Sequence, residues 1–65
     1  MPKGYYKELT TEIASLGFEY WKQAKGSHEK WRHPKSGVIV IVQRNLDSRH
    51  TANVVLRAAG SAKKF

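Results

Sequence analysis

The sequence predicts a small α+β domain with the element order α-β-β-β-α, in which two helices cover one face of a three-stranded antiparallel sheet. Apolar residues recur at helical spacing near both ends of the chain, and each of these segments is followed by a glycine. Between them lie three short segments rich in aromatic and β-branched residues. A chain of 65 residues has room for one core, because domains of this size bury only roughly 60% of their unfolded surface. We therefore expect a single domain over residues 1–65, with a tail at about 61–65 that frays.

The first helix is expected from about Tyr5 to Leu16. Its apolar positions are Tyr6, Leu9, Ile13 and Leu16. Gly17 follows the last of them and suits a left-handed helix end, after which Phe18 is expected to pack back on Ile13.

Three strands are expected to follow as a meander. Residues 18–23 form the first, residues 28–33 the second, and residues 38–42 the third. Lys25-Gly26-Ser27 separates the first two, and Pro34 and Lys35-Ser36-Gly37 separate the second from the third.

The last helix is expected to be capped by Asp47 or Ser48 and to stop at Gly60. Its apolar stripe is formed by Ala52, Val55, Leu56 and Ala59. The two helical stripes can cover one face of the sheet and leave the other face open, which is the layout of a double-stranded-RNA-binding domain (dsRBD).

The charge balance favours a polyanionic partner. Twelve Lys and Arg residues stand against five Asp and Glu, giving a formal net charge of +7. Such a surface attracts RNA, an anionic membrane or an acidic protein, and charge alone does not separate them. The lack of cysteine, the absence of an apolar leader at the start and the shortness of the apolar run 38–42 favour a cytoplasmic protein without a membrane segment.

The segment from Lys25 to His33 is the densest candidate site. Strand alternation places His28, Lys30 and Arg32 on one face, and Glu29, Trp31 and His33 on the other. RNA supplies its own nucleophile, the 2′-hydroxyl group, so cleavage needs a group that moves protons and cations that stabilise the phosphorane. We expect His28 to move the proton and Lys25, Lys30 or Arg32 to hold the phosphate, leaving a 2′,3′-cyclic phosphate.

The other candidates have structural interpretations. His28 itself can be a side chain that only contacts phosphate. His33 is expected to pack near the hairpin and His50 to be exposed on the last helix. Trp31 is expected beneath the helices, so that either Tyr20 or Trp21 remains for stacking on bases. His28 and His33 point to opposite faces, so no metal site is expected, and no phosphate-loop or dinucleotide motif indicates a small-molecule cofactor.

Several motifs resemble the HicA (YcfA-like) toxin family over nearly the whole chain. They are Gly17-Phe18, Lys25-Gly26-Ser27-His28, Arg32-His33-Pro34 and Val55-Leu56-Arg57-Ala58-Ala59-Gly60. The resemblance implies a toxin that cleaves messenger RNA without the ribosome, inhibits growth and is held inactive by a HicB-type antitoxin. It also implies that His28, in the Gly-Ser-His motif, is the catalytic residue, and it implies a role for no other residue. From their positions around His28, we expect Lys25, Gly26, Ser27, Lys30 and Arg32 to contact RNA.

The chain departs from the family pattern at three positions. Glu29 and Lys30 stand where members often have a second histidine and an apolar residue, and His50 stands where a glycine is common. Lys30 is expected to deepen the basic face. Glu29 is expected either to tune the protonation of His28 or to repel RNA.

Two non-enzymatic alternatives stay open. A dsRBD-like module could bind RNA without cutting it, and a protein-interaction domain could use the same basic surface for an acidic partner. An antitoxin is expected to cover the face that carries His28, and the apolar residues of the third strand are a further candidate partner surface.

Overall fold

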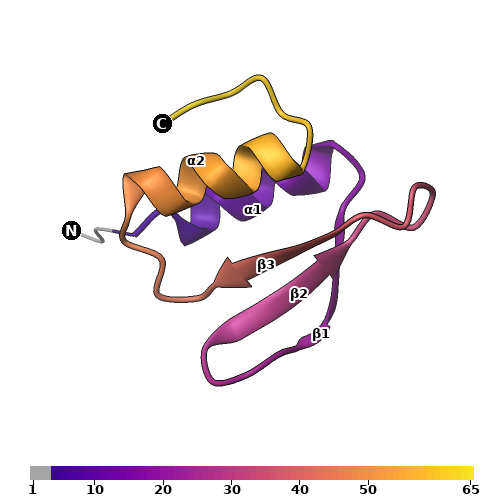
Figure 1. The fold of residues 1–65 in the computed structure, drawn as a ribbon, viewed down its shortest axis with the longest axis horizontal. Helices are drawn as coiled ribbons and strands as arrows, with labels where there is room; N and C mark the ends of the chain where they lie inside the picture. Colours follow the sequence, from indigo (N-terminus) through magenta and orange to yellow (C-terminus); the bar gives the residue numbers. More distant parts are fainter. Residues whose placement is uncertain (1–3) are drawn as a thin grey trace.

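The computed structural model describes residues 4–65 and has the predicted order α-β-β-β-α. Figure 1 shows both helices on one side of the sheet, with the other face of the sheet left open. The elements lie within two residues of their expected bounds, and they are α1 (Tyr6–Ser15), β1 (Glu19–Gln23), β2 (His28–Arg32), β3 (Ile39–Gln43) and α2 (Arg49–Ala58).

α1 ends at a glycine in a left-handed conformation, as predicted. Gly17 has a φ of 105°, and the N–H of the next residue, Phe18, donates to the carbonyl oxygen of Ile13 at 3.0 Å. This turn places the Phe18 ring in the core beside Ile13. A Cβ atom at Gly17 would lie 2.8 Å from Nε2 of His33, so both the backbone and the space require glycine here.

The sheet has the strand order β1-β2-β3 and is antiparallel throughout. β2 and β3 pair in regular register from His28 opposite Gln43 to Arg32 opposite Ile39. β1 pairs with β2 through a shift in register: Tyr20 lies opposite Trp31, whereas Lys22 lies opposite Lys30. Trp21 is therefore the extra residue of a β-bulge.

The core lies between the helices and the inner face of β3. Ser48 caps α2, since its Oγ atom accepts the N–H of Thr51 at 3.2 Å, which decides between the two expected caps. The buried apolar side chains come from both helices, β3 and the connecting segments, and are Leu9, Ile13, Phe18, Val40, Val42, Leu46, Ala52, Val55 and Leu56.

In the structure residues 61–65, the tail that is expected to fray, pack against the helices. The N–H of Phe65 donates to Oδ1 of Asn53 at 2.8 Å, and its ring lies 5.0 Å from that of Tyr5. The hydroxyl of Ser61 donates to the carboxylate of Glu12 at 2.8 Å. The terminal aromatic ring and these two hydrogen bonds offset the ordering cost that a tail of small and charged residues would otherwise carry.

Candidate nucleic-acid interface

His28 lies at the start of β2, directly after the turn that joins β1 to β2. Its Nδ1 atom is 3.0 Å from the carbonyl oxygen of Lys25. A carbonyl oxygen only accepts, so Nδ1 carries the proton of this hydrogen bond. In the neutral ring Nε2 is then unprotonated, and it has no hydrogen-bond partner among residues 4–65. The ring is half-buried, and its hydrogen bond through Nδ1 leaves Nε2 as the nitrogen that can accept from a ligand.

The turn that orients His28 is fixed to the rest of the molecule. Gly26 has a φ of 61°, and its carbonyl oxygen accepts from Nε2 of Gln23 at 2.9 Å. The carbonyl oxygen of Ser27 accepts the N–H of Arg44 at 2.9 Å, and the Ser27 hydroxyl donates to Oδ1 of Asn45 at 3.2 Å. The turn is therefore anchored to β1 on one side and to the β3–α2 connection on the other.

Lys30 and Arg32 continue from His28 along the open face of the sheet, as strand alternation predicts. Alternate residues on a strand lie about 7 Å apart. Glu29, between His28 and Lys30, points toward the helices, where it bonds to Tyr6 of α1. The three side chains thus form one row along the central strand of the open face.

The β-bulge adds an aromatic ring to this row. The Trp21 ring lies 5.1 Å from the guanidinium carbon of Arg32 and 4.5 Å from Nζ of Lys22. It is 40% exposed. A cation near an indole ring attracts its π face, so these two contacts favour this position of the ring beside Lys22 and Arg32. We call Trp21, Lys22, Lys30 and Arg32 the cationic platform.

The β3 side of the open face is apolar. Ile39 lies opposite Arg32 and Ile41 lies opposite Lys30, and the two isoleucines are 45% and 44% exposed. The open face thus carries the cationic platform on β1 and β2, with the acidic Glu19 opposite Arg32, and it is aliphatic on β3.

Glu29 does not face the site, contrary to the expectation that it would tune His28 or repel RNA. Its carboxylate is buried on the helical side, where Oε1 accepts the Tyr6 hydroxyl at 2.8 Å and Nε1 of Trp31 at 3.0 Å. Oε2 lies 3.6 Å from Nε of Arg44. Burial, and next the hydrogen bond to this carboxylate, raise the pKa of Tyr6 above its ordinary 10.0.

His33 is structural, as predicted. Its Nε2 donates to the carbonyl oxygen of Leu16 at 3.1 Å, and its Nδ1 accepts the N–H of Ser36 at 3.2 Å. The ring also packs edge-on against Phe18, with centroids 5.3 Å apart. Both ring nitrogens are engaged, so His33 ties the end of α1 to the β2–β3 hairpin and is not available for proton transfer.

The aromatic residues are divided between the core and the open face of the sheet differently from the expectation. Trp31 is half-buried beside the core rather than fully covered, and Tyr20 packs edge-on against it at 6.2 Å. Trp21, rather than Tyr20, lies among the cations of the open face. Sequence reasoning missed Lys22, and it could not place Trp21, because regular alternation gives no sign of the bulge.

The structure brings together His28, Lys30 and Arg32 and sets the turn residues Lys25, Gly26 and Ser27 at one end of their row. Lys25 contributes its carbonyl oxygen to His28, and its side chain is exposed. His50 lies on α2, in the layer on the other side of the sheet, and is exposed. Within residues 4–65, no three His, Asp or Glu side chains gather as metal ligands.

A scan against family models and searches of curated proteins and of solved structures find no match to this chain. Neither helix in the part of the chain that the structure describes is long and apolar enough to cross a membrane.

Proposed function

We propose that the protein is a metal-independent endoribonuclease that cleaves messenger RNA through His28. The observation that carries this proposal is the hydrogen bond from Nδ1 of His28 to the Lys25 carbonyl. It fixes the tautomer in which the free Nε2 accepts a proton, as a general base for the 2′-hydroxyl of RNA must.

The chemistry requires no further nucleophile. Nε2 of His28 takes the 2′-hydroxyl proton, the 2′-oxygen attacks the adjacent phosphorus, and the bond to the 5′-oxygen of the next nucleotide breaks. Water protonates the leaving oxygen, and the products are a 2′,3′-cyclic phosphate and a 5′-hydroxyl end. A single positioned base accelerates such a step by about 10²–10⁴-fold, so the enzyme is a slow one.

The neighbouring cations supply the charge stabilisation. Lys30 follows His28 on the same face at about 7 Å, close enough for both to reach one phosphate. Arg32 and the turn Lys25-Gly26-Ser27 extend the contact to the adjoining phosphates, while Trp21 offers a ring for an unpaired base. This arrangement favours a single-stranded or weakly structured substrate.

The biological role we propose is that of a cytoplasmic toxin in a toxin–antitoxin pair, and it rests on the resemblance of the Gly26-Ser27-His28 segment to HicA proteins. A HicB-type antitoxin would silence the enzyme most simply by covering the open face. The mixed character of that face supports the idea, since Ile39 and Ile41 offer apolar contact area beside cations that an acidic partner would neutralise.

The test is incubation of a defined messenger RNA with the wild-type protein, His28→Ala and His33→Ala, with a chelator present. We expect wild type and His33→Ala to cut when both are folded, and His28→Ala to be at least 100-fold slower while binding RNA within threefold of wild type. Cutting by His28→Ala at the wild-type rate would refute the proposal.

The cationic platform favours a second candidate, an RNA-binding module without cleavage. In that case all three proteins bind RNA and none cuts it. Loss of RNA binding in Lys30→Gln and Arg32→Gln, with Lys35→Gln as the exposed control, would then locate the binding face.

A further inference from the structure

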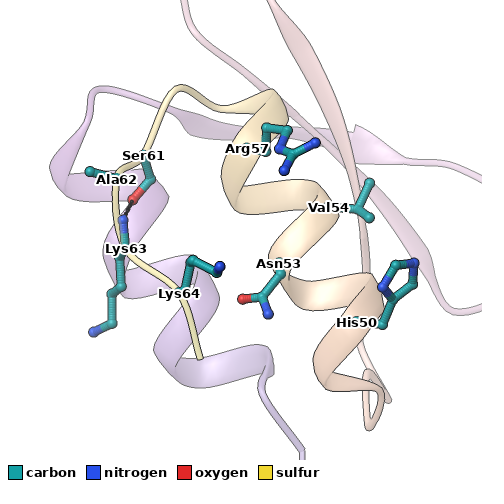
Figure 2. Close-up of a pocket in the computed structure, with 8 residues that line it drawn as sticks. All are labelled: His50, Asn53, Val54, Arg57, Ser61, Ala62, Lys63 and Lys64. Atoms are coloured by element: carbon teal, nitrogen blue, oxygen red, sulfur yellow. Dashed lines mark hydrogen bonds between the residues drawn. The ribbon is translucent and has the colours of Figure 1, made fainter.

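A second basic region lies on the opposite side of the molecule from the open face of the sheet. The tail folds back over α2 on the side of the helices away from the strands (Figure 1). Between the tail and α2 is a hollow of about 430 Å³, drawn in Figure 2. Its lining comes from one exposed face of α2 and from the tail, and consists of His50, Asn53, Val54, Arg57, Ser61, Ala62, Lys63 and Lys64.

The charge of this lining is one-sided. Its permanent cations are Arg57, Lys63 and Lys64, His50 adds an imidazole ring, and no Asp or Glu side chain lines the hollow. Glu8 and Glu12 lie outside this lining but beside Lys63, and the Glu12 carboxylate accepts the Ser61 hydroxyl at 2.8 Å. A lining with three cationic and no acidic side chains concentrates anions.

Asn53 gives the hollow a fixed polar donor. Its Oδ1 atom accepts the N–H of Phe65, which orients the amide and leaves Nδ2 as a donor. In Figure 2 Asn53 lies between α2 and the tail, and Lys64 extends from the tail toward it. Ser61 is not such a donor, because its hydroxyl hydrogen is directed to Glu12 and its oxygen accepts the N–H of Lys63.

The backbone of the tail is held against the rest of the domain before any ligand arrives. Phe65 packs on Tyr5 and Lys63 lies 5.9 Å from the Phe65 ring. Ordering the tail in the free protein reduces the entropy that a ligand bridging α2 and the tail would have to offset.

We propose that this hollow binds a phosphate monoester or inorganic phosphate, with Arg57, Lys64 and Nδ2 of Asn53 as its principal contacts. A dianion matches a wall with three permanent cations better than a singly charged group does, and guanidinium and amide groups form directed hydrogen bonds to phosphate oxygens. The site is independent of His28 and of the proposed cleavage.

The simpler account of Arg57 is that it only complements the negative end of the α2 dipole, since it is the basic residue of the last turn. That account explains neither the lack of acidic side chains in the lining nor the packing of the tail against the helices. It predicts no preference for phosphate over chloride.

The test is a titration of the isotopically labelled protein with inorganic phosphate at constant ionic strength, followed by NMR. We expect amide shifts centred on residues 50, 53, 57 and 62–64, with a Kd of about 1 mM. Arg57→Gln/Lys64→Gln should raise that Kd at least tenfold. Lys7→Gln/Lys35→Gln, which removes the same charge from exposed positions outside the lining, should change it less than threefold.

Two further ligands identify the source of the phosphate. A short RNA carrying a 5′-phosphate should shift the same amides more strongly than its 5′-hydroxyl counterpart if the site recognises RNA ends. Equal effects of the two RNAs, with free phosphate still binding, would assign the site to small phosphorylated molecules. Shifts spread over all lysines, or equal effects of the two double variants, would overturn the proposal.

Discussion

Replacement of Glu29 by alanine is expected to lower the free energy of unfolding by about 3 kcal/mol. A hydrogen bond to a charged group contributes about 1.5–3 kcal/mol, and this carboxylate accepts two, from Tyr6 and Trp31. Because both donor residues are only half-buried, water can replace part of each lost hydrogen bond, and the expected loss of stability stays near the lower end of the range for two such bonds. The ion pair with Arg44 adds little to the stability, because the Arg44 side chain is 70% exposed and its Nε lies 3.6 Å from Oε2 of Glu29.

A loss of this size is large for so short a chain. Stabilities of about 0.05–0.15 kcal/mol per residue give this domain about 3–10 kcal/mol in total. At about 4–8 °C per kcal/mol, Glu29→Ala should lower Tm by about 12–24 °C.

The assay is urea unfolding followed by far-ultraviolet circular dichroism, because Trp31 fluorescence would itself respond to the substitution. Glu29→Gln, which keeps an acceptor oxygen and loses the charge, should lose about half as much stability. Glu8→Ala, at an exposed position in the first turn of α1, should lose at most about 1 kcal/mol. Equal losses in Glu29→Ala and Glu8→Ala would refute the account of the buried carboxylate.

Four other outcomes follow from the contacts described above. Gly17→Ala should destabilise by roughly 2–3 kcal/mol, from the left-handed backbone and the displaced His33 ring, and thermal unfolding that matches wild type would contradict this. The pKa of Tyr6 is raised in the folded state, so the contribution of Tyr6 to the free energy of unfolding is complete below pH 10 and falls as the pH rises beyond it. Unfolding measured between pH 8 and 11 should show this fall in wild type and not in Tyr6→Phe. Trp21→Ala should weaken binding of single-stranded RNA by about 5- to 150-fold, and Tyr20→Ala should weaken it less. Fluorescence anisotropy measures both affinities, and a larger loss in Tyr20→Ala would contradict this ranking. Lys30→Gln should reduce the slope of log K against log salt by about 0.7, and an unchanged slope would place the RNA elsewhere.

The periodic features of the sequence were sufficient to predict the fold. Apolar spacing located both helices, and the residues before and after them, Ser48 and Gly17, act as the cap and the left-handed end expected of them. Alternation along β2 also gave the correct faces for His28 and Glu29. These features depend on local geometry, which a sequence expresses directly.

The features of the structure that the sequence did not predict depend on contacts between distant segments. The bulge at Trp21 arises from the register of β1 against β2, and no residue near it marks the shift. The ordered tail depends on Phe65 reaching Tyr5 and Asn53, which are far away in the sequence. Glu29 beside His28 in the sequence suggested an interaction, but adjacent strand residues point to opposite faces and Tyr6 and Trp31 hold the carboxylate there.

The central claim, proton transfer by His28 from the 2′-hydroxyl of RNA, is tested most directly by removing that hydroxyl. An RNA with one 2′-deoxy nucleotide at a mapped cleavage position should resist cutting there and still be cut at the other positions, where the products carry 2′,3′-cyclic phosphate ends. Cleavage that continues at the 2′-deoxy position would contradict the claim.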